Sequence, residues 1–166
     1  MPTLWYKGAS MAEEIDIREV SGCTCLSARR AGRRLTQIYD DALRPAGLTV
    51  NQFGLLAKLY GASLAGRPSL SMGALAERLG MDPTTLNRNL KPLGAQGLVA
   101  DSADHEDRRV RAVFITTKGV AKLRKAVAFW RRAQTRVEAA LGAEASQTLR
   151  SLLDLASAKL AKKPRE

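Results

Sequence analysis

The feature that most constrains the fold is the segment GMDPTTLNRNLKPLGAQGLV, residues 80–99. Gly80 favours a tight turn, Asp82 is a good N-cap, and Pro83 suits a first helical position, where no backbone N–H is needed. One helix face would then carry Leu86, Leu90 and Leu93. The pattern predicts a helix that follows a turn, buries its leucines and exposes polar side chains. Pro92 should bend or shorten the second half of this helix.

The neighbouring segments extend this helix into a recognisable supersecondary unit. A short helix should precede it, capped by Ser71, with its core residues at Leu75, Ala76 and Leu79. A helix, a tight turn and a second helix with polar side chains form a helix-turn-helix. Residues 98–100 and 110–115 are apolar or β-branched and predict a two-stranded hairpin around a polar loop, residues 101–109. The predicted fold class is mainly α (α+β), a winged helix-turn-helix with flanking helices.

Helical periodicity also marks the chain on both sides of this unit. A first long helix should bury Ala28, Ala31, Leu35, Ile38 and Ala42 and end at Pro45 and Gly47. A second should begin with a capping box between Thr49 and Gln52 and end at Gly61. Its buried face would consist of Phe53, Leu56, Leu59 and Tyr60.

Two further helices should complete the chain, the first capped by Thr117 and ended by Gly142. Its apolar residues form a heptad-like seam, which Gln134 interrupts: Val120, Leu123, Val127, Trp130, Val137 and Leu141. The last helix would continue the apolar series with Leu149, Leu152, Leu153, Ala156 and Leu160. These helices exceed what a small winged-helix domain can cover, so they predict a dimer interface; the alternative is that they cover one chain's own core. The predicted organisation is an N-terminal extension (residues 1–20), a helical dimerisation region (21–47 and 117–166) and a winged helix-turn-helix domain (48–116).

Charge and composition narrow the class of partner. The formal net charge of +11 favours polyanions, above all nucleic acid. No apolar run is long enough to span a bilayer, and the N-terminus lacks the pattern of a secretion signal, so a cytoplasmic protein without a membrane partner is expected. Two cysteines and one histidine, His105, cannot supply a structural zinc site on their own. We expect no metal and no cofactor.

Three segments together resemble the multiple-antibiotic-resistance regulator (MarR) family: LRPAGLTVNQFGLLAKL, MGALAERLGMDPTTLNRNLKPLGAQGLV and DHEDRRVRAVFITTKG. The resemblance runs from about Cys23 to the end of the chain. It implies a homodimeric transcription factor, usually a repressor, that binds an inverted-repeat DNA operator. It also implies release by small aromatic or phenolic anions, bound between the dimerisation region and the winged helix, or in some branches by oxidation of a cysteine.

The same resemblance assigns DNA contacts to two segments. On the recognition helix the candidates are Pro83, Thr84, Thr85, Asn87, Arg88 and Lys91. Asn favours adenine and Arg favours guanine in the major groove, whereas Lys91 is expected on phosphate. In the wing loop the candidates are Asp107, Arg108 and Arg109. Arg109 would enter a narrow, A·T-rich minor groove, and Asp107 would orient a neighbouring arginine.

The segment SGCTCLSARRAGRR, residues 21–34, holds both cysteines. In the hydroperoxide-sensing branch that the first helix resembles, a reactive cysteine precedes a tyrosine by two heptads, and Cys25 and Tyr39 match this spacing. They would lie about 21 Å apart along one helix, so they could meet only across a dimer. Arg29 replaces a second tyrosine of that branch. Cys25 is therefore a candidate sensor or a small core residue, and Cys23 a resolving or bystander thiol.

Two other functions remain open. One is a non-specific architectural DNA-binding protein, which would bind without regard to sequence. The other is a thiol peroxidase, which would need a base near its cysteine; the single histidine lies about 80 residues away, in the expected wing. The sequence therefore favours a regulator and not an enzyme.

Overall fold

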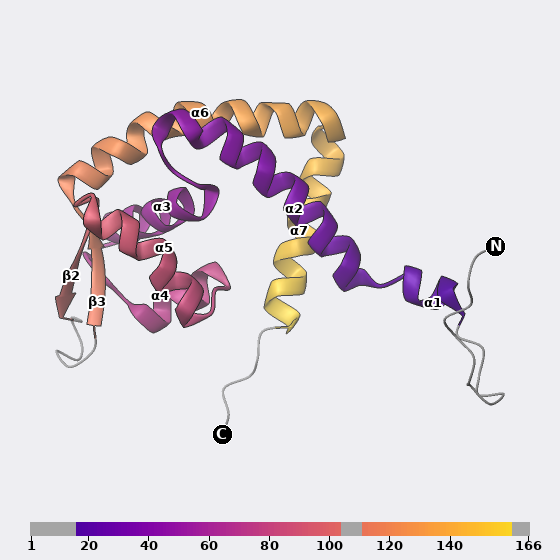
Figure 1. The fold of residues 1–166 in the computed structure, drawn as a ribbon, viewed down its shortest axis with the longest axis horizontal. Helices are drawn as coiled ribbons and strands as arrows, with labels where there is room; N and C mark the ends of the chain where they lie inside the picture. The colour runs from indigo at the N-terminus through magenta and orange to yellow at the C-terminus, as the bar shows by residue number, and fades with distance from the viewer. Residues whose placement is uncertain (1–15, 104–110, 161–166) are drawn as a thin grey trace, which may run out of the picture. The chain divides into compact units, whose positions relative to one another are not determined.

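A computed structural model describes residues 16–103 and 111–160 of the chain (Figure 1). The elements before the sheet are α1 (Ile17–Ser21), α2 (Thr24–Leu43), the 3-10 turn η1 (Arg44–Ala46) and α3 (Val50–Leu64). The winged-helix elements that follow are β1 (Leu70–Ser71), α4 (Met72–Leu79), α5 (Pro83–Ala95), β2 (Val99–Ala103) and β3 (Arg111–Ile115). Two helices complete the fold, α6 (Thr117–Leu141) and α7 (Ala143–Leu160). The predicted fold class, a mainly helical winged helix-turn-helix, is confirmed.

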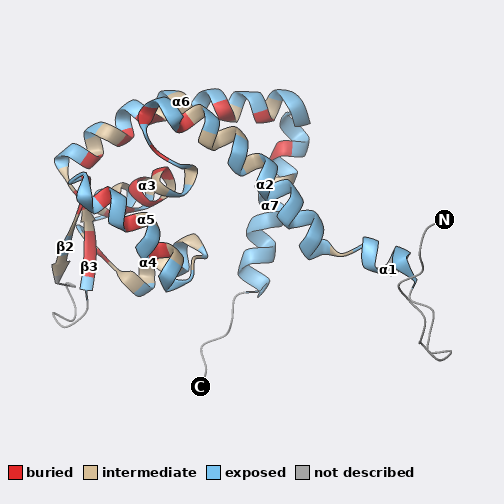
Figure 2. Cartoon of the chain, in the orientation of Figure 1, coloured by how far each residue is buried: buried red, intermediate tan, exposed pale blue. Residues whose placement is uncertain are grey.

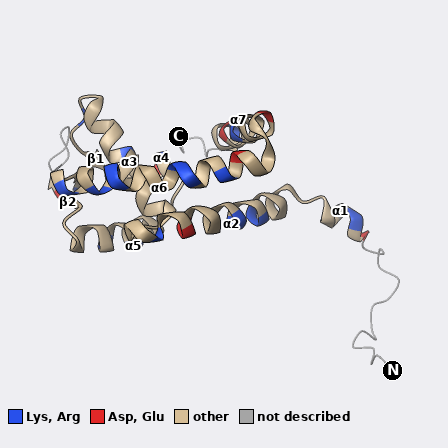
Figure 3. Cartoon of the chain, turned by 90° about the horizontal axis from the view of Figure 1, so that it is seen from above, with Lys and Arg blue, Asp and Glu red and all other residues tan. Residues whose placement is uncertain are grey.

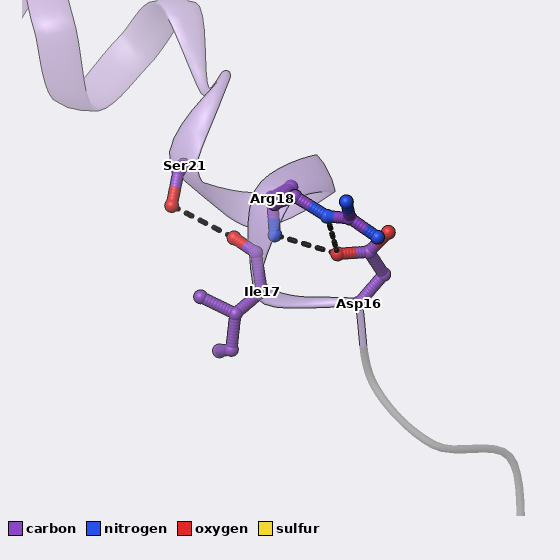
Figure 4. A network of polar contacts seen from close by, with 4 residues as sticks. All are labelled: Asp16, Ile17, Arg18 and Ser21. Carbon is purple, nitrogen blue, oxygen red and sulfur yellow. Dashed lines mark hydrogen bonds and ion pairs between the residues drawn. The ribbon is translucent and has the colours of Figure 1, made fainter.

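The chain divides into two compact units between Arg34 and Leu35, and helix α2 continues from the first unit into the second. In the first unit, α1 lies within the segment expected to be an extension. Asp16 accepts hydrogen bonds from the backbone N–H (2.9 Å) and Nε (3.1 Å) of Arg18, and the Ser21 hydroxyl donates to the Ile17 carbonyl (Figure 4). The side-chain and backbone bonds from Arg18 lower the pKa of Asp16. The bonds to Asp16 thus lie at the start of the short helix α1, and the bond from Ser21 lies at its end.

The core of the second unit consists mainly of leucines from α3, α4 and α5 and residues of the sheet (Figure 2). The largest side chains with almost no exposed surface are Leu43, Leu55, Leu56, Leu59, Leu75, Leu86, Leu93, Leu98 and Val113. The predicted leucine face of the recognition helix is confirmed, since Leu86, Leu90 and Leu93 are all buried. Each buried leucine side chain contributes roughly 1.5–3 kcal/mol relative to an exposed one, so this face holds α5 firmly against the domain.

Three predicted helix starts, those of α3, α4 and α5, agree with the structure. Thr49 and Gln52 form a reciprocal capping box, Ser71 caps α4, and Asp82 caps α5 with Pro83 in its first turn. Gly80 takes the left-handed conformation, φ +59°, between the two helices of the motif. Because each of these caps joins residues only three positions apart, the local sequence is enough to predict them.

Two predicted helix boundaries are wrong. Helix α3 does not end at Gly61 but continues to Leu64, because Ala62 is buried and the turn falls on Gly66 at φ +76°. The cap of α6 is Thr116, not Thr117, because the Thr116 side chain accepts from the Gly119 N–H. The expectation that Pro92 bends or shortens its helix named no end residue: α5 continues through Pro92 and ends three residues later, at Ala95.

The hairpin is confirmed, and it belongs to a three-stranded antiparallel sheet of order β1-β3-β2. In the ladder between β2 and β3, Val99 pairs with Ile115 and Asp101 with Val113. The first strand, which was not predicted, pairs Leu70 with Val113 and Ser71 with Ala112. Two residues are too short for a period-two pattern in the sequence, so only the pairing with β3 defines this strand.

Helix α6 joins the sheet through a close backbone contact. The Thr116 hydroxyl accepts a hydrogen bond from the Gly119 N–H (3.0 Å), and the Thr116 N–H donates to the Leu98 carbonyl (3.1 Å). Gly119 is buried, and a Cβ atom placed there would lie 2.1 Å from the Leu98 carbonyl oxygen and 2.7 Å from Ile115 Cγ1. Only glycine therefore fits where α6 crosses the base of the hairpin.

The helices of the described segments include none that is long and apolar enough to cross a membrane.

The substitution Gly119→Ala should destabilise the fold, because the new methyl group would overlap backbone atoms that cannot move independently. We expect a loss of about 2 kcal/mol or more in the free energy of unfolding, at the level of an overpacked core. Urea unfolding followed by circular dichroism measures it. Gly73→Ala in α4 is the matched control, since a Cβ there meets nothing within 4 Å. Equal stability of the two variants would contradict the close contact.

Candidate nucleic-acid interface

Helix α5 begins at a capped and charged N-terminus. Asp82 accepts hydrogen bonds from the Thr85 N–H (2.9 Å) and the Thr85 hydroxyl (2.6 Å). These bonds, first from the Thr85 side chain and then from its backbone, lower the pKa of Asp82. Since the Thr85 hydroxyl is committed to this cap and the residue is half-buried, Thr85 supports the start of the helix. It presents less to solvent than the other candidates of the recognition helix.

Those other candidates share the exposed side of α5. Pro83, Thr84, Asn87, Arg88 and Lys91 are exposed, opposite the buried leucines. The structure therefore brings together five of the six residues predicted for this helix. Asn89, which was not a candidate, is half-buried and donates from Nδ2 to the Thr85 carbonyl (2.8 Å). Burial of one face leaves a polar, cationic face toward solvent, the pattern of a helix that reads a DNA groove.

The wing residues Asp107, Arg108 and Arg109 lie outside the described residues. At the end of the described hairpin that adjoins the loop, Arg111 on β3 and Asp101 on β2 form an ion pair. Arg111 donates from Nε (3.1 Å) and Nη2 (3.0 Å) to Asp101 Oδ1 and from Nη2 (3.2 Å) to Oδ2. Neither residue was a sequence candidate, because Asp101 was assigned to the polar loop. Two opposite charges on either side of the predicted hairpin loop were the sequence signal that could have indicated this ion pair.

A groove of about 610 Å³ separates α5 from the hairpin. Its polar lining comes from both elements, with Asn87 and Lys91 on α5 and Asp101 and Arg111 on the strands. The recognition helix and the hairpin therefore line an open groove that holds two cations and one carboxylate.

Basic residues extend beyond the winged helix (Figure 3). Helix α6 has one acidic residue, Glu138, and a series of cations: Lys118, Lys122, Arg124, Lys125, Arg131, Arg132 and Arg136. Arg132 stacks over the Phe129 ring, with its guanidinium carbon 5.6 Å from the ring centroid. The positive charge is thus distributed along helices and is not confined to a terminal tail.

An apolar cavity of about 380 Å³ lies between α3 and α6. Its lining is Phe53, Ala57, Tyr60, Gly61, Val120, Leu123, Arg124 and Val127. Phe53 also stacks on Trp130, with ring centroids 6.0 Å apart. The sequence analysis placed most of these residues in the hydrophobic core or in the apolar seam of α6. It did not identify Arg124 as the cation that lines this cavity. The cavity depends on how α3 and α6 pack against each other, which the sequence does not show.

The candidate sensor residues fall in different settings. Cys25 is exposed and Cys23 is half-exposed, both as free thiols. Tyr39 donates from its hydroxyl to Gln134 Oε1 (2.7 Å), and Gln134 donates from Nε2 to Glu138 Oε1 (2.7 Å). Burial, then the nearby Glu138 carboxylate, raises the pKa of Tyr39. The Tyr39 hydroxyl thus has a partner of its own within the second unit.

A metal centre finds no support in the residues that the structure describes. Within residues 16–103 and 111–160, no group of three or more His, Cys, Asp or Glu side chains could hold a metal ion. His105 lies outside these ranges.

The capping contribution of Asp82 should disappear in acid. Its folded-state pKa lies below the ordinary value of 3.8, so the ionised carboxylate stabilises the fold fully above that pH and loses this effect as pH falls through the folded-state pKa. We expect Asp82→Ala to unfold at lower urea concentration than wild type at neutral pH, with the difference narrowing in acid. Asp82→Asn keeps a capping oxygen and should lie between them without titrating. A pH-independent difference would contradict this role of the carboxylate.

Comparison with known proteins shows which family has this fold and these motifs. A family model described as "MarR family" matches residues 46–110. The HTH-type transcriptional repressor Rv2887 of Mycobacterium tuberculosis is 31% identical over 125 residues, which cover 75% of this chain and 86% of the relative. This relative is named as a transcriptional repressor and not as an enzyme.

Two solved structures extend the comparison. The M. tuberculosis transcriptional regulator MosR, in complex with DNA, is 42% identical with a TM-score of 0.69, covering 84% of this chain and 97% of that one. Bordetella bronchiseptica BpsR, whose DNA binding is regulated by 6-hydroxynicotinic acid, is 25% identical with a TM-score of 0.70, covering 82% of this chain and 94% of that one. On sequence identity, coverage and fold, the chain belongs to the MarR family of winged helix-turn-helix transcriptional regulators.

Proposed function

We propose that this protein acts as a homodimeric transcriptional repressor that binds an inverted-repeat operator in double-stranded DNA. Release from the operator would follow binding of a small aromatic anion or oxidation of Cys25. The observation that carries the proposal is the two-sided recognition helix. Helix α5 buries Leu86, Leu90 and Leu93 and exposes Asn87, Arg88 and Lys91 next to a cationic groove.

The exposed side of α5 has the chemistry of a groove reader. Arg88 can bind guanine through two N–H groups, Asn87 can bind adenine through its amide, and the methyl group of Thr84 can contact thymine. Lys91 lies one turn beyond Asn87 and suits a phosphate. The relatives support this use of the helix, since MosR was solved in complex with DNA. In the same proposal, Asp107, Arg108 and Arg109 form the wing contacts.

The dimer is supported by apolar surface that one chain leaves uncovered. Along one face of α7, Leu152 is 57% exposed, Leu153 45% and Leu160 82%. Such a row of exposed leucines on one helix is unusual for a monomer, because contiguous apolar surface favours a partner. We therefore assign residues 21–47 and 117–166 to dimerisation and residues 48–116 to DNA binding. A two-fold dimer would place its half-sites about one DNA helical turn apart, near 34 Å.

The cavity between α3 and α6 is the site that we propose for a small aromatic anion. Phe53, Val120 and Val127 supply apolar walls, and Arg124 supplies a cation at the lining. Its volume lies at the lower end of the range for small-molecule sites. The DNA binding of BpsR is regulated by 6-hydroxynicotinic acid, an aromatic carboxylate of the size and charge that this lining suits. Because α6 leads directly into the hairpin through Thr116, a ligand there can shift the wing.

Oxidation of Cys25 is the second proposed trigger. Its thiol is exposed and therefore open to a peroxide. To stabilise a Cys25 thiolate of a second chain, the Tyr39 hydroxyl would exchange its hydrogen bond to Gln134 Oε1 for one to the sulfur. Cys23, half-exposed and two residues earlier, would serve as a resolving thiol or as a bystander.

Substitutions on α5 should separate base reading from phosphate binding. We expect Arg88→Ala to reduce the preference for a selected duplex over unrelated DNA by about tenfold or more, through loss of a base contact. Lys91→Ala should weaken both complexes to a similar degree and lower the salt dependence by about one charge. Fluorescence anisotropy with a duplex enriched from random sequence by the wild-type protein measures both. Wild-type binding without sequence preference would instead indicate an architectural protein.

The two triggers should be separable by one pair of variants. Arg124→Met replaces the aliphatic stem of the arginine but removes the cation, so release by 6-hydroxynicotinic acid or a related aromatic carboxylate should need about tenfold more ligand. Release by peroxide should be unchanged. Cys25→Ser should show the reverse, with loss of peroxide release and normal release by the carboxylate.

Each variant in this pair is the control for the other, and a DNA-release assay with wild type measures both. If Cys25→Ser still responds to peroxide, Cys25 is not the sensor. If Arg124→Met responds to the carboxylate like wild type, the cavity is not the anion site. Repeated turnover of peroxide with a thiol reductant would favour a thiol peroxidase over a regulator.

A further inference from the structure

The groove between α5 and the hairpin contains a carboxylate where a DNA-binding surface would not be expected to have one. Asp101 lines the groove together with Asn87, Lys91 and Arg111. Phosphate repels a carboxylate, and this chain otherwise has an excess of positive charge. The position of Asp101 therefore calls for a physical reason other than affinity for DNA.

The ladder register places Asp101 and Arg111 on the same face of the hairpin. Asp101 pairs with Val113, and Arg111 pairs with Ala103, so the two charged residues are diagonal neighbours across β2 and β3. Val99 and Val113, from the same face, also line the groove. The ion pair thus lies on the side of the sheet that borders α5.

Asp101 fixes the arginine and leaves part of it free. It accepts from Nε and Nη2 of Arg111, at 3.0–3.2 Å. A guanidinium has five N–H donors, so the Nη1 donors remain for another acceptor. Within the described residues, Asp101 is the acceptor found for this side chain. Bidentate pairing restricts the guanidinium plane and so orients these free donors.

Stability alone is a weak reason for this pair. The side chains of Arg111 and Asp101 are 55% and 62% exposed. Ion pairs at that exposure contribute little to folding, because water screens them and ordering two long side chains costs entropy. The pair is therefore better explained by what it positions than by what it stabilises.

We propose that Asp101 is a positioning residue that holds Arg111 for contact with one backbone phosphate of the bound DNA. Lys91, from the other side of the groove, would neutralise the same phosphate, and the Asn87 amide would donate to it or to the adjoining base. This inference rests on the proposed function. With α5 in a major groove and the wing in the neighbouring minor groove, the strand between those grooves must cross the space between these two elements.

The charge of Asp101 allows a test with opposite outcomes. Asp101→Asn removes a negative charge near DNA, so a passive carboxylate predicts tighter binding. A positioning role predicts weaker binding, by about threefold to tenfold. Arg111→Lys keeps the charge but cannot form the two-oxygen pair, and should weaken binding to a similar degree. Asp16→Asn and Arg67→Lys are matched controls, since both residues are exposed and lie outside the groove and outside the proposed dimerisation region.

A phosphate scan identifies the contact itself. The probe is the duplex enriched by the wild-type protein, with single phosphates replaced one at a time by neutral methylphosphonate. In wild type, one position in each half-site should weaken binding markedly. In Arg111→Lys and Asp101→Asn, the penalty at that same position should fall to the part that Lys91 contributes, while penalties elsewhere remain unchanged. Circular dichroism and urea unfolding establish that the variants are folded.

The results separate this proposal from the function on which it rests. Tighter binding by Asp101→Asn, or phosphate penalties unchanged in both variants, overturns the positioning role and leaves the operator-binding proposal in place. A wild-type protein that does not prefer the enriched duplex overturns the proposed function. If the wild-type protein prefers the enriched duplex, and if Asp101→Asn and Arg111→Lys both reduce the penalty at the same phosphate, the proposed function and the positioning role are both supported.

Discussion

Burial of the leucine face of α5 is the constraint on which the rest of the interface depends. Leu86 and Leu93 have no exposed surface and Leu90 has 4%. Since side chains on a helix are fixed relative to one another by its 3.6-residue period, burying these three determines where Asn87, Arg88 and Lys91 point. The polar and cationic chemistry of the exposed side is thus a consequence of hydrophobic packing on the opposite side of the same helix.

Glycine at position 119 provides the second constraint, because it lets α6 begin directly on the carbonyl of Leu98. The Thr116 hydroxyl caps α6 and also donates to the Gly97 carbonyl (2.8 Å). One threonine therefore ties the end of the hairpin to the start of the long helix. A ligand in the cavity between α3 and α6 would act on the helix to which the wing is joined, which gives the proposed release a mechanical route.

Charge in this protein works at two ranges. The excess of lysine and arginine draws DNA to the whole molecule, and salt screens this attraction over about 10 Å. Selectivity has to come from side chains with defined orientations. Arg111 is held by Asp101, whereas Arg88 depends on the rigidity of α5. A carboxylate beside an arginine weakens the local attraction for phosphate, but it can offset this loss by fixing the direction in which the arginine donates its hydrogen bonds.

The sequence by itself determined the starts of α3, α4 and α5 and the order of the main elements. Asp82, Ser71 and Thr49 each cap through a bond to a residue three positions later, and the leucine spacing of α5 needs no information from distant parts of the chain. It could not determine β1, the length of α3 beyond Gly61, the pairing of Asp101 with Arg111, the cavity beside Arg124 or the bond from Tyr39 to Gln134. Each of these joins residues or surfaces far apart in the sequence or depends on burial that only the assembled core provides. Tertiary packing decided them because the energy of such contacts exists only once the elements have been brought together.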